Sequence, residues 1–256
     1  MNSSQVIRSY INTFTSLEGK TVLDAPCGRG ATSALVRKKG AKVLSFDLFP
    51  EFFNVDGQKS NFADLSESLP LPDESVDIII CQEGIEHLPN QLFAIQQFYR
   101  VLKKGGELLI ITPNISNFAG RLAQFIFESQ LIRCSPESYN ETIWTINGSN
   151  TNNISRDRYY YGHIFLIGMQ KLRTLLQLSG FTKIKSMKTG ISSTSLFLSL
   201  TLYPVIFLMS CNIFIRDYIK YKNNKSLLRE KFYQFYENIA ARTLLNRKLF
   251  LISKKM

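Results

Sequence analysis

Cysteine and histidine are scarce in this sequence of 256 residues, which contains four cysteines and two histidines. No two cysteines form a C-x-x-C pair, so we expect neither a disulfide framework nor a cysteine-based zinc site. The N-terminal residues lack the basic head and apolar run of a secretion signal. Free thiols without such a signal are typical of a reducing compartment, and the sequence therefore predicts a cytoplasmic location.

Acidic residues are scarce in only one part of the chain. Lysine and arginine number 31 against 20 aspartates and glutamates, which gives a net charge of +11. Residues 216–256 contain 11 basic and 3 acidic residues, whereas residues 1–215 contain 20 and 17. Because the basic character belongs to the tail, the body of the protein has no broad basic surface for a polyanion. We expect no nucleic-acid partner.

The stretch Thr21–Gly30, TVLDAPCGRG, joins a short aliphatic run to a proline and two glycines. Residues 31–39, which follow, have helical composition. The pattern predicts a buried strand, a tight glycine turn and a helix start. Glycines let a ligand approach the backbone closely, and the N–H groups of a first helical turn attract its polar end. A nucleotide-like cofactor is therefore expected here, with a purely structural turn as the alternative.

The details of the turn separate the possible cofactors. A dinucleotide fingerprint requires G-x-G-x-x-G, but Ser33 stands at the third glycine position, and no Walker lysine follows. Asp24 ends the predicted strand, where its carboxylate would repel a pyrophosphate but would suit a cationic amine. S-adenosylmethionine carries an ammonium and a sulfonium group, and it therefore fits this turn better than a dinucleotide does.

Two further acidic residues follow predicted strands. Asp47 ends the apolar segment 41–47, where an acceptor in a βαβ unit takes the ribose hydroxyls. A solvated aspartate at a strand end is the alternative for Asp47. Asp64 ends a short segment before a loop punctuated by prolines, and a carboxylate there is expected to accept a hydrogen bond from an adenine amino group.

Five motifs occur in one order along the chain, namely residues 22–30, Asp47, Asp64 followed by 69–77, Glu83–His87, and 100–107. Together they resemble the motifs of class I S-adenosylmethionine-dependent methyltransferases, of the broad type that modifies small molecules and surface glycans in bacteria. The resemblance implies an α/β fold, with a three-layer Rossmann-like sheet and one antiparallel closing strand. It departs at Pro26, which replaces the usual first glycine, and at Lys104, where a proline often stands. Pro26 requires only a negative φ and no N–H donor, so cofactor binding is expected to survive.

The resemblance assigns roles to these residues. Asp24 would face the methionine amine, the backbone of residues 27–30 would line the carboxypropyl chain, Asp47 would take the ribose, and Asp64 the adenine amine. The predicted cofactor-binding residues are Asp24, Ala25, Cys27, Gly28, Gly30, Asp47, Leu48, Ala63, Asp64, Gln82 and Glu83.

His87 and His163 are the candidate catalytic residues, because a hydroxyl acceptor loses one proton while the protein chiefly positions the reactants. A structural or substrate-binding histidine is the alternative for each. Glu83, Glu86 and His87 have the E-x-x-E-H spacing that some methyltransferases use for a divalent metal. The sequence places no further histidine beside them, and we therefore predict no metal site.

Residues 114–160 are predicted to form a substrate insertion. It contains an aromatic-bearing helix near Phe118 and a polar loop, residues 134–158, that carries Tyr139 and Trp144. Aromatic rings among amides and hydroxyls suit a sugar, and a surface loop without function is the alternative. No acidic cluster that would bind an amine accompanies them, and the sequence therefore favours O-methylation of a glycan.

Residues 191–215 contain no charged side chain and are flanked by basic residues. As a helix, Leu196–Ile215 would be about 30 Å long, enough to span a bilayer. However, segments 180–186 and 247–253 read as strands, and the resemblance implies that they pair antiparallel, which places both flanks on one side of a membrane. With Pro204 as a bend, we predict a hairpin in or on the membrane, and a basic tail on anionic headgroups. A pair of buried helices, or a dimer face, is the alternative.

The predicted organisation is a methyltransferase domain of residues 1–190, a membrane-associating insertion of residues 191–246, and a closing strand within 247–256. We expect a cytoplasmic enzyme on the inner face of the cell membrane that O-methylates a glycolipid or a polyprenyl-linked saccharide. Two alternatives stay open. One is a methyltransferase for a quinone-type ring or another lipid-like small molecule, and the other is a non-catalytic adaptor tethered through the apolar segment.

Overall fold

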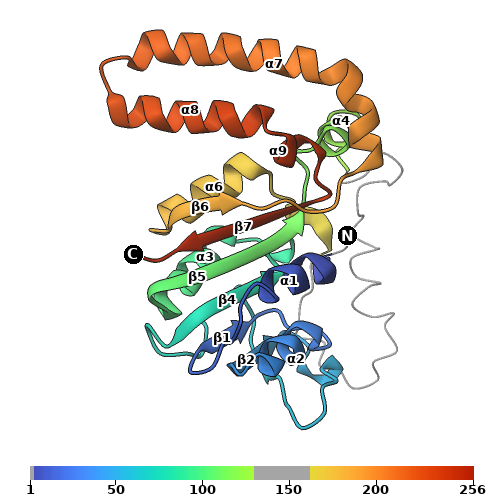
Figure 1. The fold of residues 1–256 in the computed structure, drawn as a ribbon, viewed down its shortest axis with the longest axis vertical. Helices are drawn as coiled ribbons and strands as arrows, with labels where there is room; N and C mark the ends of the chain where they lie inside the picture. The colour runs from blue at the N-terminus through green and yellow to red at the C-terminus, as the bar shows by residue number, and fades with distance from the viewer. Residues whose placement is uncertain (1–2, 130–161) are drawn as a thin grey trace.

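The computed structural model describes residues 3–129 and 162–256. A seven-stranded mixed sheet forms its centre, in the order β3-β2-β1-β4-β5-β7-β6 (Figure 1). In chain order the strands are β1 Thr21–Asp24, β2 Lys42–Asp47, β3 Asn61–Phe62, β4 Val76–Gln82, β5 Leu102–Pro113, β6 Thr182–Ser186 and β7 Lys248–Lys254.

The predicted sugar-compatible loop with Tyr139 and Trp144 lies outside the described residues.

The direction of the strands confirms the predicted Rossmann-like sheet. Strands β1 to β5 run parallel to one another, whereas β7 lies antiparallel between β5 and β6. Parallel pairing places the carboxyl ends of β1, β2 and β4 at one edge, where open α/β sheets bind ligands.

Helices cover both faces of the sheet and complete three layers. Helices α1 (Ser3–Ile11) and α2 (Ala31–Lys38) pack on one face, and α3 (Gln91–Val101) and α6 (Met169–Leu178) pack on the other. The two cores separate because successive strand residues point to opposite faces. In β4, for example, Ile80 joins the first core and Ile79 the second.

Helix α1 ends earlier than its apolar spacing predicts. Apolar residues at helical spacing from Val6 to Phe14 predict a helix over residues 2–16, but α1 stops at Ile11. Just beyond it, the Thr13 hydroxyl donates to the Tyr10 carbonyl at 2.7 Å, a local bond that competes with helix continuation. Phe14 still packs edge-on against Tyr10. The apolar spacing at Phe14 therefore reflects packing of its side chain, although the backbone is no longer helical.

A helical hairpin is inserted between β6 and β7. Helix α7 (Ser193–Tyr221) is continuous for 29 residues, α8 (Lys225–Ile239) returns along it, and α9 (Ala241–Leu245) leads into β7. The apolar helical insertion before the last strand is thereby confirmed. The chain reversal that we assigned to Pro204 is wrong, because the chain turns at residues 222–224. A proline removes one helical hydrogen bond and bends the helix, and its apolar neighbours continue the helix beyond it.

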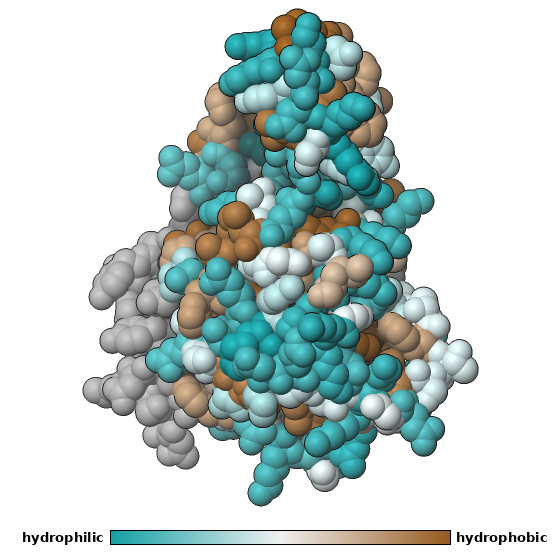
Figure 2. All heavy atoms as spheres, turned by 90° about the vertical axis from the view of Figure 1, so that its left-hand side faces the viewer, coloured by the Kyte–Doolittle hydropathy of each residue, from teal (hydrophilic) through white to brown (hydrophobic). Residues whose placement is uncertain are grey.

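Helix α7 is exposed along most of its length. Within the described part of the chain, it is the one helix long and apolar enough to cross a membrane, and only 6% of its most apolar 18-residue window is buried. Its N-terminal end packs beside α4 (Phe118–Phe127), and the hairpin projects beyond the α/β body (Figures 1 and 2). The end of the hairpin that faces the viewer in Figure 2 is largely hydrophilic, with hydrophobic atoms along its top. The face of α7 that points away from α8 therefore has no cover within the described residues.

Substitution of Gly30 by alanine tests the turn that joins β1 to α2. Gly30 has a φ of +88°, and a Cβ there would lie 2.4 Å from Val55 Cγ2 and 2.5 Å from Phe53 Cε2. Gly57 is the matched control, since its φ is +65° but a Cβ would meet nothing within 4 Å. We expect Gly57→Ala to lower the free energy of unfolding by about 1 kcal/mol, and Gly30→Ala by about 2–4 kcal/mol, in urea titrations. Equal losses would contradict a crowded turn.

Candidate functional site

A cavity of about 450 Å³ opens at the carboxyl ends of β1, β2 and β4. Nine of the eleven predicted cofactor-binding residues line it, namely Asp24, Cys27, Gly28, Asp47, Leu48, Ala63, Asp64, Gln82 and Glu83. Ala25 and Gly30 lie behind this wall, because Ala25 is fully buried and Gly30 faces Val55 and Phe53. The cavity is of the size that small-molecule ligands occupy.

Asp24 is the buried acid of the cavity wall, with 1% of its surface exposed. Its Oδ2 accepts a hydrogen bond from Ser33 Oγ at 2.6 Å, and Ser33 in turn contacts Ser45 Oγ at 2.8 Å. Asp24 Oδ1 is buried without a hydrogen-bond partner among the described residues. Burial raises the pKa of Asp24 to about 7, the charge of Asp47 adds to the rise, and the Ser33 bond opposes it. A cationic amine bound at Oδ1 would offset the free-energy cost of burying this carboxylate.

Ser33 explains why the third glycine of a dinucleotide fingerprint is missing. It lies in the first turn of α2, fully buried, and its hydroxyl is the donor that holds Asp24. A glycine there would lack the hydroxyl that donates to Asp24 Oδ2. Ser33, whose presence argued against a dinucleotide motif in the sequence, thus holds the Asp24 carboxylate in the structure.

Asp47 joins two loops of the cavity wall. Its Oδ2 accepts from the Gly28 backbone N–H at 2.7 Å, and its Oδ1 accepts from the Phe49 N–H at 2.9 Å. Each carboxylate oxygen has a second lone pair, so both can still accept from ribose hydroxyls. The glycine turn therefore depends on Asp47 for its position.

Asp64 caps its own turn at the adjacent part of the wall. Its Oδ1 accepts from the Ser66 N–H at 2.7 Å, and the Ala63 N–H donates to the Asp47 carbonyl at 3.0 Å. These bonds connect the turns of Asp47 and Asp64, and both residues line the same cavity as Asp24.

Glu83 is held by two residues that sequence analysis did not identify. Ser3 Oγ of α1 donates to Glu83 Oε1 at 2.6 Å, and Lys248 of β7 pairs with Glu83 Oε2. Ser4, next to Ser3, lines the cavity, so α1 closes over it as a packing helix. Lys248 is 165 residues from Glu83, and no local pattern marks such a pair.

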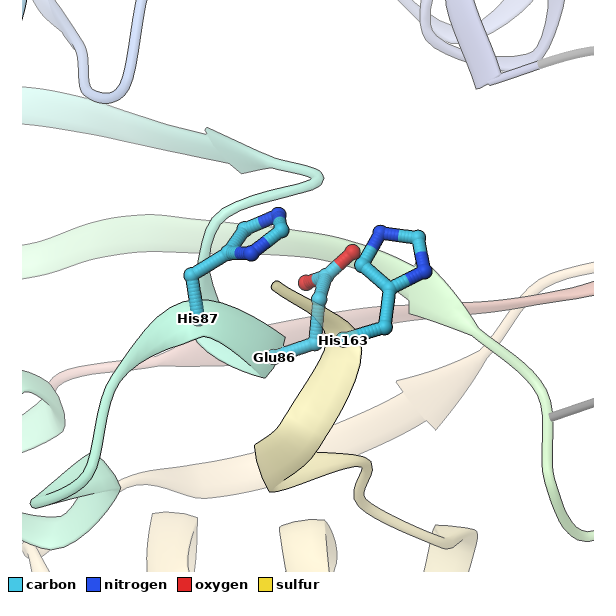
Figure 3. A group of neighbouring side chains, drawn as sticks. All are labelled: Glu86, His87 and His163. Carbon is cyan, nitrogen blue, oxygen red and sulfur yellow. The ribbon is translucent and has the colours of Figure 1, made fainter. Parts of the chain in front are cut away.

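Glu86, His87 and His163 come together at one end of the cavity (Figure 3). His87 lines the cavity, and the centroid of its ring lies 5.0 Å from that of His163. Glu86 is fully buried, its Oε2 accepts from Thr112 Oγ1 at 3.0 Å, and burial raises its pKa to about 7. His163 follows His87 by 76 residues, so the fold supplies the second histidine that the sequence does not place beside this motif.

The raised pKa of Asp24 predicts a pH-dependent stability. Between about pH 4 and pH 7 the unfolded chain ionises Asp24 while the folded state keeps the proton. The folded state then binds more protons, and its free energy of unfolding falls as pH rises through this window. Asp24→Asn removes this contribution, whereas the similar effect of Glu86 is common to both proteins.

Urea titrations from pH 4 to pH 7 measure the effect. Relative to Asp24→Asn, the wild-type protein should lose stability with rising pH, by at most about 4 kcal/mol over the window. A difference between the two proteins that stays constant with pH would contradict a buried, protonated Asp24.

Comparison with known proteins identifies the family to which the chain belongs. A family model described as a methyltransferase domain matches residues 3–186. The ubiquinone biosynthesis O-methyltransferase of Xylella fastidiosa (strain M23) is 33% identical over 126 residues, which cover 44% of this chain and 50% of the relative. That of Pseudomonas entomophila is 30% identical over 118 residues, which cover 41% and 50%. The chain spans about half the length of these curated relatives.

A solved structure has the same fold. The S-adenosylmethionine-dependent methyltransferase from Archaeoglobus fulgidus superposes with a TM-score of 0.54 and 16% identity, and covers 99% of this chain and 95% of its own. At this identity the likeness establishes the fold, and the family model establishes the relationship. The chain therefore belongs to the methyltransferase-domain family, and it has the Rossmann-like fold of S-adenosylmethionine-dependent methyltransferases.

Proposed function

We propose that this protein transfers a methyl group from S-adenosylmethionine to a hydroxyl of a lipid-like acceptor presented at the membrane surface. The favoured acceptor is a glycolipid or a polyprenyl-linked saccharide. The observation that carries the proposal is the exposed apolar helix α7, attached to a body with a cavity for the cofactor.

The described residues fit the cofactor. The unpartnered oxygen of buried Asp24 offers a seat for the methionine ammonium, and binding of the amine lowers the cost of ionising this carboxylate. Asp47 and Asp64 have lone pairs for the ribose hydroxyls and the adenine amine. The bound cofactor supplies a methyl carbon activated by a sulfonium. The chain supplies its orientation toward the end of the cavity that Glu83 and His87 line.

The membrane part of the proposal rests on the position of the exposed apolar residues. The most exposed of them on α7 are Phe197, Leu200, Leu208, Met209 and Ile219. Phe125 of α4, which packs beside α7, is 87% exposed. Lys220, Lys222 and Lys225 lie at the turn of the hairpin, where they would meet anionic headgroups. Apolar exposure on this scale is typical of a surface that binds a partner or a membrane.

A second candidate acceptor is a quinone-type ring hydroxyl. It is favoured by the relatives named ubiquinone biosynthesis O-methyltransferases, at 33% identity over part of the chain. Both candidates have a hydroxyl acceptor on a molecule with a long apolar chain, so both agree with the exposed hairpin. They differ in the group that receives the methyl.

Radiolabelled cofactor separates these acceptors. The pure protein is incubated with methyl-labelled S-adenosylmethionine and total membrane lipids and glycans, and the labelled product is identified by mass spectrometry. A methyl ether on a lipid-linked sugar supports the favoured acceptor, and a methoxylated ring supports the second. Label found only on an amine, or only on water-soluble molecules, would overturn the proposal.

Asp47→Ala tests the assignment of the cofactor site. Loss of charge-assisted hydrogen bonds should weaken S-adenosylmethionine binding by roughly 1.5–3 kcal/mol in isothermal calorimetry. Asp73→Ala is the control, because Asp73 is a surface aspartate paired with Arg100 and is remote from the cavity lining. Unchanged affinity in Asp47→Ala would mean that another group takes the ribose. No binding by the wild-type protein would favour the adaptor alternative.

Substitution of the outer face of α7 tests the membrane contact. Phe197, Leu200 and Leu208 are 74%, 77% and 68% exposed, so their joint replacement by aspartate leaves the core intact. We expect the triple variant to lose flotation with vesicles that contain anionic lipid, whereas Leu178→Asp, 66% exposed on α6, keeps it. A wild-type protein that does not float with such vesicles at low salt would refute the membrane contact.

A further inference from the structure

The fold assembles a carboxylate and both histidines of the chain in one place. Glu86 and His87 lie on the 3-10 turn Ile85–His87, and His163 begins the 3-10 turn His163–Phe165. One ligand atom from each side chain lies within 4.8 Å of the others. Figure 3 shows the carboxylate of Glu86 between the two imidazole rings. These groups are those of a metal site with two nitrogen ligands and one oxygen ligand, and they lie close enough for a small movement to bring them to one ion.

Burial of Glu86 is a second, independent indication. The residue is 0% exposed, and Thr112 donates to only one of its oxygens. The other oxygen, Oε1, is buried without a hydrogen-bond partner among the described residues. An unpartnered buried carboxylate oxygen is costly, and a cation held against it would offset that cost.

His87 has the hydrogen bond that orients a ligand histidine. Its Nδ1 lies 3.1 Å from the carbonyl oxygen of Gly162, the residue before His163. Because a carbonyl only accepts, Nδ1 carries the proton in the neutral ring, and Nε2 keeps its lone pair. Metal-binding histidines commonly donate their other ring N–H to a carbonyl or carboxylate in this way. The same bond ties the segment that carries His163 to the turn that carries His87.

We infer that Glu86, His87 and His163 form a site for a divalent cation such as Zn²⁺, which binds the hydroxyl oxygen of the acceptor. Two histidines and one carboxylate leave an open coordination position, and His87 places that position at the cavity wall. Glu83 is not among the ligands, because Ser3 and Lys248 hold it. The three side chains would close by about 1 Å to reach usual metal–ligand distances.

The cation makes the acceptor a better nucleophile, in a step that rests on the proposed function. Coordination lowers the pKa of the hydroxyl, whose proton leaves to water. The oxygen then forms a bond to the methyl carbon while the carbon–sulfur bond breaks, so the products are a methyl ether and S-adenosylhomocysteine. Both histidines act as ligands in this assignment, and neither is required as a base.

Metal titration of the pure full-length protein tests the site without cofactor or acceptor. The protein carries a purification tag free of histidine, so that the two imidazoles of the chain are the only ones present. Zn²⁺ is titrated in competition with a chromophoric chelator, and Co²⁺ is titrated by visible absorption. We expect one equivalent to bind, with an affinity that falls at least about tenfold in His163→Ala. Asp47→Asn, a cavity acid outside the cluster, should keep the metal affinity.

The outcomes distinguish this inference from the proposed function. Absence of a saturable equivalent, unchanged binding in His163→Ala, or a thiolate-to-cobalt charge-transfer band would overturn the metal site. Circular dichroism of His163→Ala shows that a loss of binding is not a loss of fold. A wild-type protein that binds one metal ion through nitrogen and oxygen, yet methylates no lipid-linked hydroxyl, would refute the acceptor and leave the metal site standing.

Discussion

Burial of the Asp24 carboxylate is the constraint on which the cavity depends. The strand that carries it is covered on both sides, so no water shell compensates its charge, and Ser33 bonds only one of its oxygens. Such a group costs free energy in the unliganded protein. A cationic ligand at the same point would convert this cost into binding energy. Parallel pairing with β1 places the ends of β2 and β4 on either side of Asp24. The residues at these strand ends form the rest of the cavity wall.

The acids of the cavity differ in their surroundings, and these surroundings separate their roles. Asp24 is buried away from water, and Asp47 accepts hydrogen bonds from two backbone N–H groups. The charge of Glu83 is balanced by an ion pair with Lys248. Glu86 lies deeper, bonded to Thr112 on one oxygen. The end of the cavity that Asp24 and Asp47 line therefore offers acceptors for an amine and for hydroxyls. The opposite end holds a carboxylate between two imidazoles, a group of donors that favours a metal ion.

The hairpin of α7 and α8 follows from the position of β7 in the sheet. Because β7 pairs antiparallel with both β5 and β6, the chain must leave the sheet after β6 and return to it. The two helices project from the body between these points, where the sheet cannot cover them (Figure 1). An uncovered helix of a water-soluble domain normally has a polar outer face. The outer face of α7 is apolar instead, and this difference is the basis of the proposed contact with a bilayer.

The sequence by itself determined the order of strands and helices in the α/β body, the glycine turn, and the acidic strand ends of Asp24 and Asp47. These are local patterns whose period and turn residues are read directly along the chain. The antiparallel closing strand was expected only from the resemblance to class I methyltransferases. Only the tertiary structure decided that Ser33 supports Asp24, that Lys248 neutralises Glu83, and that His163 lies beside Glu86 and His87. The last two pairings join residues far apart in the chain, and packing alone sets their distance. It also decided that the chain turns after α7 rather than at Pro204, because continued helix formation outweighs the loss of one hydrogen bond.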